Sequence, residues 1–117
     1  MVNFENIRSE LEGNNEWKRS LAISKVDKAI NEDKKIEEEI FDLFPDLLFD
    51  LSDGVDEFNV KGVIIKYLNN QDDENIKREV YEKLETRMEA WKEKEQKENI
   101  ERKRKLIRDI KRLTSPL

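Results

Sequence analysis

Two clusters of charged side chains hold the residues of this chain that are best suited to chemistry or recognition. The first is a row of four aspartates that recur about once per helical turn: Asp42, Asp46, Asp50 and Asp53. Carboxylates one turn apart lie ~5–6 Å from each other, against ~3.4 Å between phosphates along a DNA strand, so the row imitates a phosphate backbone only approximately. Its predicted role is to bind a basic partner, and the alternative is the solvated outer face of an ordinary helix.

The second cluster is a basic stretch near the C-terminus. Bases and apolar residues share helical spacing there, which predicts an amphipathic helix whose partner-binding residues are Arg104, Lys105, Leu106, Arg108, Ile110, Lys111 and Arg112. Such a helix suits an acidic groove on a protein, phosphates or an anionic membrane. No aromatic residue follows Trp91, which disfavours a membrane and also base stacking on single strands. The alternative is a solvated helix end whose bases favour the helix dipole.

Several classes of chemistry are excluded by residue types that the sequence lacks. It contains no His and no Cys, so Ser/His/Asp catalysis, Cys/His catalysis and thiolate metal sites are impossible. The three glycines have no spacing that would form a phosphate-binding loop. Acidic residues around Gly54 do not follow the order of a calcium-binding loop. We therefore expect no catalytic residues, no cofactor and no metal, and predict that the protein is not an enzyme.

The composition indicates a small helical protein with a highly charged surface. Charged residues make up 44% of the 117 residues, against roughly 25% in an ordinary domain. No apolar run approaches the ~18 residues of a membrane-spanning helix. The N-terminus lacks the basic start and apolar block of a signal peptide. The expectations are one compact domain, no membrane association and a cytoplasmic location.

Helix signals dominate the first part of the chain. Asn3 and Asn15 are predicted N-caps, and Gly13 is the expected stop of the first helix. The second helix is expected over residues 16–31, the third over 34–44 and a short fourth over 45–52, followed by a turn at Asp53 and Gly54. Pro45 is the predicted boundary between the third and fourth helices, because the residue before a proline avoids the helical region.

Residues 55–69 favour a helix that is buried nearly all round. Val60, Val63, Ile64 and Tyr67 form one stripe, and Phe58 and Ile65 cover the other side. The alternative is a hairpin that turns at Lys61 and Gly62, which is a poor match to the usual turn sequences. Trp17 and Leu21 of the second helix are expected to contact a further neighbour.

From residue 74 to residue 113 the chain contains no Gly or Pro, which predicts one helical rod of about 60 Å. An apolar stripe at Val80, Leu84, Met88 and Trp91 faces the core, and residues 92–99 contain no apolar side chain. The later stripe, from Ile100, is out of phase with the first. The sequence therefore predicts an all-α protein, a small helical bundle with a long, partly projecting C-terminal helix. Its expected parts are a compact acidic body over residues 1–91 and a basic extension over residues 92–117.

Charge is divided unevenly between the two parts of the chain. Residues 1–75 hold 19 acids and 9 bases, a net of −10, and residues 76–117 hold 9 acids and 14 bases, a net of +5. The polarity favours a non-catalytic protein-binding module. The Lys-, Asn-, Ile- and Glu-rich composition suggests a small regulator or inhibitor of phage or mobile-element type that occludes or scaffolds a partner. A protein that handles nucleic acid is one candidate for this partner. The alternatives are a nucleic-acid-binding protein that uses the basic helix and a self-assembling structural protein, a homodimer through that helix. A basic helix that simply lies on the acidic body would also explain the polarity.

Overall fold

A computed structural model describes residues 4–32, 34–50, 54–71 and 73–114 of the chain. These residues form seven helices: α1 (Phe4–Glu12), α2 (Glu16–Asn31), α3 (Glu38–Phe41), α4 (Phe44–Asp50), α5 (Gly54–Asn69), α6 (Glu74–Lys92) and α7 (Lys97–Thr114). They contain no strand within those ranges, which confirms the predicted all-α bundle.

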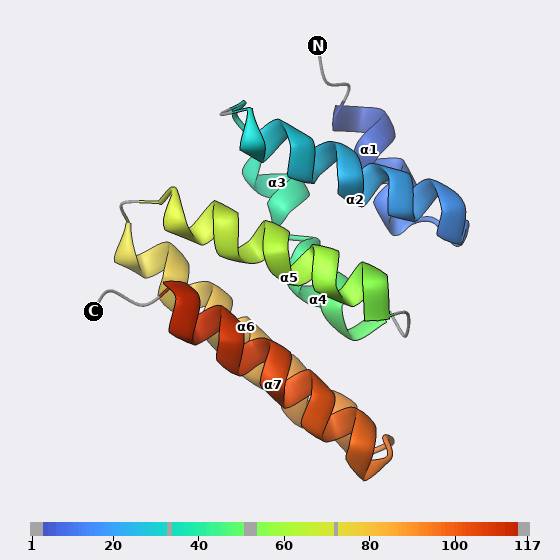
Figure 1. Cartoon of the computed structure of the whole chain (residues 1–117), viewed down its shortest axis with the longest axis vertical. Helices are drawn as coiled ribbons and strands as arrows, with labels where there is room; N and C mark the ends of the chain where they lie inside the picture. Colours follow the sequence, from blue (N-terminus) through green and yellow to red (C-terminus); the bar gives the residue numbers. More distant parts are fainter. Residues whose placement is uncertain (1–3, 33, 51–53, 72, 115–117) are drawn as a thin grey trace.

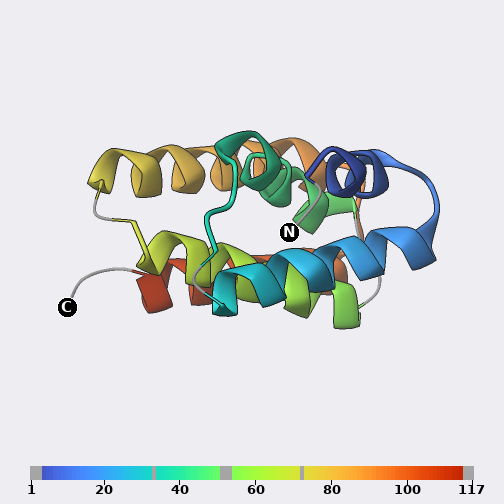
Figure 2. The ribbon, with the colours of Figure 1, turned by 90° about the horizontal axis from the view of Figure 1, so that it is seen from above.

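The helices lie in two layers. In Figure 2, α2, α5 and α7 form one layer, and α1, α3, α4 and α6 form the other. The shortest extent of the molecule is 19 Å, about two helix diameters. Helices α2, α5 and α7 lie side by side and run in the same direction, and α6 runs back behind α7 in the other layer (Figure 1).

Local signals place several helix ends where the sequence predicts them. The side chain of Asn15 accepts a hydrogen bond from the main-chain N–H of Lys18 at 3.0 Å and caps α2. Gly13 follows the end of α1, and Asp73 caps α6 through the N–H of Asn75 at 2.9 Å. Pro45 lies in the first turn of α4, where its missing N–H costs nothing, but the boundary between α3 and α4 falls at residues 42–43, before the predicted position. The predicted cap Asn3 and the turn at Asp53 lie outside the described residues.

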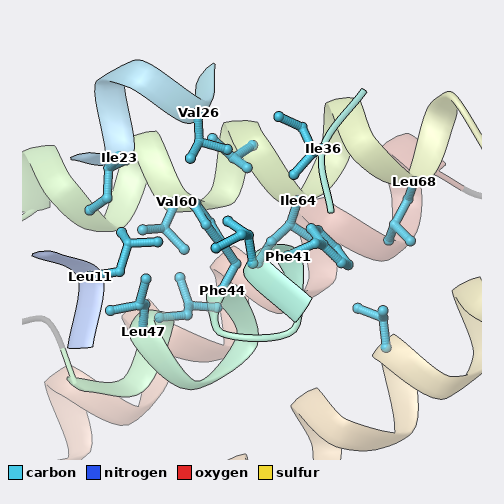
Figure 3. Packing of buried hydrophobic residues seen from close by; sticks show 14 of the residues in the cluster. Leu11, Ile23, Val26, Ile36, Phe41, Phe44, Leu47, Val60, Ile64 and Leu68 are labelled. Atoms are coloured by element: carbon cyan, nitrogen blue, oxygen red, sulfur yellow. The ribbon is translucent and has the colours of Figure 1, made fainter. Parts of the chain in front are cut away.

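A single apolar core fills the space between the layers. Figure 3 shows Phe41 and Phe44 beneath Val60 and Ile64 of α5. The ring of Phe41 stacks on Tyr67 with 3.7 Å between centroids. From α6, the predicted stripe contributes the buried side chains Val80, Leu84 and Met88 and the partly buried Trp91. The core therefore draws on both layers.

The third predicted helix is shorter than expected. Only Glu38–Phe41 is helical, and Glu37 is extended, with a ψ of 136°. Ile36 is nonetheless buried, because the segment that crosses between the layers carries it into the core. The expected helix over residues 34–44 is wrong for its first residues, since burial of Ile36 outweighs their helical propensity. It is also wrong at its end, because α3 stops at Phe41 and Phe44 already belongs to α4.

Residues 54–69 form a helix and not a hairpin, but this helix is not buried on all sides. Phe58 is 63% exposed, and Ile65 is only partly buried. On α2, Trp17 is 73% and Leu21 is 42% exposed, so the expected second neighbour of these two residues is absent from the described part of the chain. The outer face of the α2–α5–α7 layer has no helix packed on it within the described ranges, which explains all three exposures (Figure 2).

The predicted single rod over residues 74–113 is also wrong. It breaks after Lys92, and α7 returns antiparallel to α6 and packs on α5 as well (Figure 1). Ile107 and Ile110 are buried in the core, so the C-terminal helix does not project. Residues 92–99 offer no apolar contact to extend α6, whereas folding back buries the later stripe.

Candidate partner-binding site

The acidic row of α4 faces the bases of α6. Arg87 pairs with Asp46 at 3.1 Å and with Asp50 at 3.4 Å, and Lys83 pairs with Asp46 at 3.7 Å. Lys83 also donates a hydrogen bond to the main-chain carbonyl of Asp42 at 3.0 Å. These contacts neutralise part of the row within the chain. The Asp42 side chain is exposed, and Asp53 lies outside the described residues.

The predicted basic site divides into an inner and an outer half. Ile110 is completely buried and Leu106 is partly buried, so these two predicted partner-binding residues pack against the core of the chain itself. Lys111 pairs with Glu85 of α6. Four bases of the predicted site remain exposed, and these are Arg104, Lys105, Arg108 and Arg112.

The exposed bases differ in their access to carboxylates. Arg112 lies 3.6 Å from Asp109 one turn earlier on the same helix. Arg104, Lys105 and Arg108 have no carboxylate within ion-pair distance among residues 4–32, 34–50, 54–71 and 73–114. Arg104 and Arg108 line a groove of about 290 Å³ between α6 and α7, which is also lined by Glu85, Met88 and Glu89. This edge of α7 presents unneutralised positive charge on a well-anchored helix.

Lys103 belongs to the fold and not to the exposed basic surface. Its ammonium group is fully buried and lies 3.4 Å from Glu57, which is itself 1% exposed. Burial lowers the pKa of Lys103, and the negative charge of Glu57 opposes that shift. The spacing of Lys103 with Ile107, Ile110 and Thr114 could have identified this position, because it places Lys103 on the buried stripe.

Exposed apolar side chains occur on each of the three helices of one layer. Trp17 and Leu21 come from α2, Phe58 from α5 and Leu113, which is 50% exposed, from α7. Large aromatic side chains are enriched at the energetic centres of protein interfaces. None of these residues is among the predicted partner-binding residues, because each occupies a position in an apolar pattern that is typical of a core.

A second groove, of about 430 Å³, lies beside Tyr67 and the ends of α2 and α5. Burial raises the pKa of Tyr67, and the charges of Glu38 and Asp42 raise it further, so the phenol stays protonated at neutral pH. Lys34 and Lys35 also line this groove. In the described part of the chain, no three His, Cys, Asp or Glu side chains gather closely enough to hold a metal ion.

Comparisons with known proteins add no relationship. No family model matches the chain, and neither the curated proteins nor the solved structures yield a match. No helix within the described ranges is both long and apolar enough to cross a membrane.

Proposed function

We propose that this protein is a non-catalytic protein-binding module, a small regulator or inhibitor of phage or mobile-element type that occludes or scaffolds an acidic partner. The observation that carries the proposal is the edge of α7, where Arg104, Lys105 and Arg108 are exposed without a described carboxylate in reach. Buried Ile107 and Ile110 hold this helix on the body, so the bases are presented from a rigid support.

A protein partner fits the surface better than a nucleic acid does. Phosphates would satisfy the bases but would leave Trp17 and Phe58 exposed on the other two helices of the layer. An acidic protein surface with apolar residues satisfies both kinds of side chain.

A paired charge reversal tests the proposal. A tagged wild-type protein and the variant Arg104→Glu/Arg108→Glu are used to recover partners from the native cell, with and without nuclease. The matched control is Arg78→Glu/Lys94→Glu, which changes the net charge equally at exposed sites on α6 and in the α6–α7 turn. We expect a nuclease-resistant protein that the control retains and the α7 variant loses, and that binds directly when both proteins are purified.

Two results would contradict the proposal. Recovery that nuclease abolishes, with an affinity that falls steeply with salt at a slope of about −0.9 per neutralised phosphate, would indicate nucleic-acid binding. Equal recovery by the α7 variant and the control would remove α7 from the interface.

A further inference from the structure

The outer face of α5 carries a short apolar strip with a gap at its centre. Phe58, Gly62 and Ile65 follow the spacing i, i+4, i+7 and therefore share a face, opposite the buried Val60 and Ile64. Phe58 is largely exposed and Ile65 is partly buried. The strip lies on the side of the α2–α5–α7 layer that is turned away from the other layer.

Gly62 has no role in the packing of the chain itself. A Cβ atom built at this position meets no atom within 4 Å. Glycine in the interior of a helix costs roughly 1 kcal/mol relative to alanine. The fold would tolerate a side chain here, so the open space above Gly62 is available to the backbone of another element, which glycine allows to approach closely.

Two leucines of α7 extend the strip across the α5–α7 boundary. Leu106 lies one helical turn from both Arg102 and Asp109, and these two residues pair with α5, Arg102 with Glu57 at 3.1 Å and Asp109 with Lys61 at 3.6 Å. Leu106 and, one turn beyond Asp109, Leu113 therefore lie on the side of α7 that faces α5. Phe58, Ile65, Leu106 and Leu113 thus border one shallow apolar surface over Gly62.

The rim of this surface is positively charged. Glu57 forms ion pairs with both Arg102 and Lys103, and Asp109 forms ion pairs with both Lys61 and Arg112. Asp109 is thus shared by Lys61 and Arg112, and Arg102 shares Glu57 with the buried Lys103, so cations outnumber these two carboxylates. Lys105, which lies on the same face of α7 as Asp109 and Arg112, adds an exposed charge without a described carboxylate.

We propose that this α5–α7 surface docks an amphipathic helix of the partner, with an apolar stripe edged by carboxylates and with its backbone passing over Gly62. The inference rests on the proposed function and specifies the partner's chemistry. The apolar stripe of the partner covers Phe58 and Leu113, and its carboxylates pair with the cations that share Asp109 and Glu57. A second copy in a symmetric contact would place two cationic rims against each other, which like-charge repulsion disfavours.

A peptide-display selection tests this docking mode with a defined probe. The library presents helical peptides of about 18 residues, about five turns, with each position drawn from Ala, Leu, Gln, Glu and Lys. The full-length protein is the bait. We expect enriched peptides to carry Leu at i, i+3 or i+4, and i+7, with Glu and not Lys beside that stripe.

The enriched peptides are then measured against two glutamine variants. Gly62→Gln fills the gap on α5, and Ala90→Gln adds the same side chain at an exposed position of α6 in the other layer. We expect Gly62→Gln to weaken binding by about tenfold or more and Ala90→Gln to leave it unchanged. Circular dichroism and thermal melting confirm that both variants remain folded.

Other results of these experiments would contradict the inference, and each would show which part of it is wrong. Enriched peptides that are basic, or that bind Gly62→Gln as tightly as the wild type, would exclude docking over Gly62. If Arg104→Glu/Arg108→Glu still loses its cellular partner in that case, the proposed function stands and only the helix-docking mode fails. A concentration-dependent dimer in sedimentation velocity that Gly62→Gln abolishes would assign the surface to a second copy.

Discussion

The ammonium nitrogen of Lys103 on α7 lies 3.4 Å from a carboxylate oxygen of Glu57 on α5, and both side chains are withdrawn from solvent. The same ammonium donates a hydrogen bond to the main-chain carbonyl of Leu48 in α4. It also lies 5.8 Å and 5.2 Å from the ring centroids of Phe49 and Trp91. One buried cation therefore contacts residues of α4, α5 and α6.

Removal of the negative charge from this pair should destabilise the fold strongly. In Glu57→Gln the ammonium of Lys103 stays buried without a counter-charge, so we expect the free energy of unfolding to fall by about 3–5 kcal/mol. The measurement is equilibrium unfolding in urea. Glu101→Gln, at an exposed position of α7, is the control and should change stability by less than about 0.5 kcal/mol.

The double variant Glu57→Leu/Lys103→Met separates the charge effect from packing. Replacing both members of a buried ion pair with apolar residues of similar volume is often neutral or stabilising. We therefore expect this variant to be within about 1 kcal/mol of the wild type, or more stable. A double variant as unstable as Glu57→Gln would show that shape, and not charge compensation, governs this position.

A comparison of two apolar positions on α7 tests whether this helix is part of the core. Ile110 is fully buried, so Ile110→Ala should lower the free energy of unfolding by about 2–5 kcal/mol. Leu113 lies three residues later and is half exposed, so Leu113→Ala should lower the free energy of unfolding by less than about 1 kcal/mol. Equal, small losses in urea unfolding would indicate a helix that projects from the body.

Gly62→Ala should stabilise the isolated protein. The added methyl group meets no atom within 4 Å, and alanine reduces the backbone freedom of the unfolded chain. We expect the free energy of unfolding to rise by about 0.5–1 kcal/mol. The reverse change at an exposed helical site, Ala90→Gly, should lower it by a similar amount, and thermal unfolding followed by circular dichroism measures both. A loss of stability in Gly62→Ala would mean that a neighbour occupies the space above α5.

Tyr67 should make stability depend on pH at the alkaline end. Burial, with the charges of Glu38 and Asp42, raises the pKa of its phenol above the ordinary value of 10.0. The folded state therefore holds this proton more tightly than the unfolded state, so the stabilisation is complete below pH 10.0 and is lost as the pH rises through the folded pKa. Tyr67→Phe removes the titrating group, so the fall in stability should be shallower in this variant. Identical slopes for wild type and Tyr67→Phe would contradict the assignment.

The local signals in the sequence were sufficient to predict most of the helices. Asn15 caps α2 through a hydrogen bond to a residue three positions away, and Gly13 directly follows the last residue of α1. The stripe of Val80, Leu84 and Met88 is buried as its spacing predicts. These features depend on contacts within one or two helical turns, which the order of residues determines directly.

The direction of α7 depended on the tertiary structure. Residues 93–96 contain only Lys, Glu and Gln, which are good helix formers, so no local signal marks the reversal after Lys92. The reversal occurs because a continued rod would leave Ile107 and Ile110 in water, whereas the folded-back helix buries both against the body. The free energy that selects the turn arises in contacts with α5 and α6, far from the turn itself.

The sequence by itself determined that the chain is helical, where most helices begin and which stripes are apolar. Only the tertiary structure decided which charged residues remain available. Lys103 and Arg104 are adjacent bases in the sequence, yet one lies in the core against Glu57 and the other is exposed at the edge of α7. Likewise, Phe58 is of a residue type that is typical of a core, but it lies in solvent because no helix of the described chain covers its side of α5. The cause is the same in both cases: burial and charge pairing depend on which helix packs on which face, and that arrangement is a property of the whole fold.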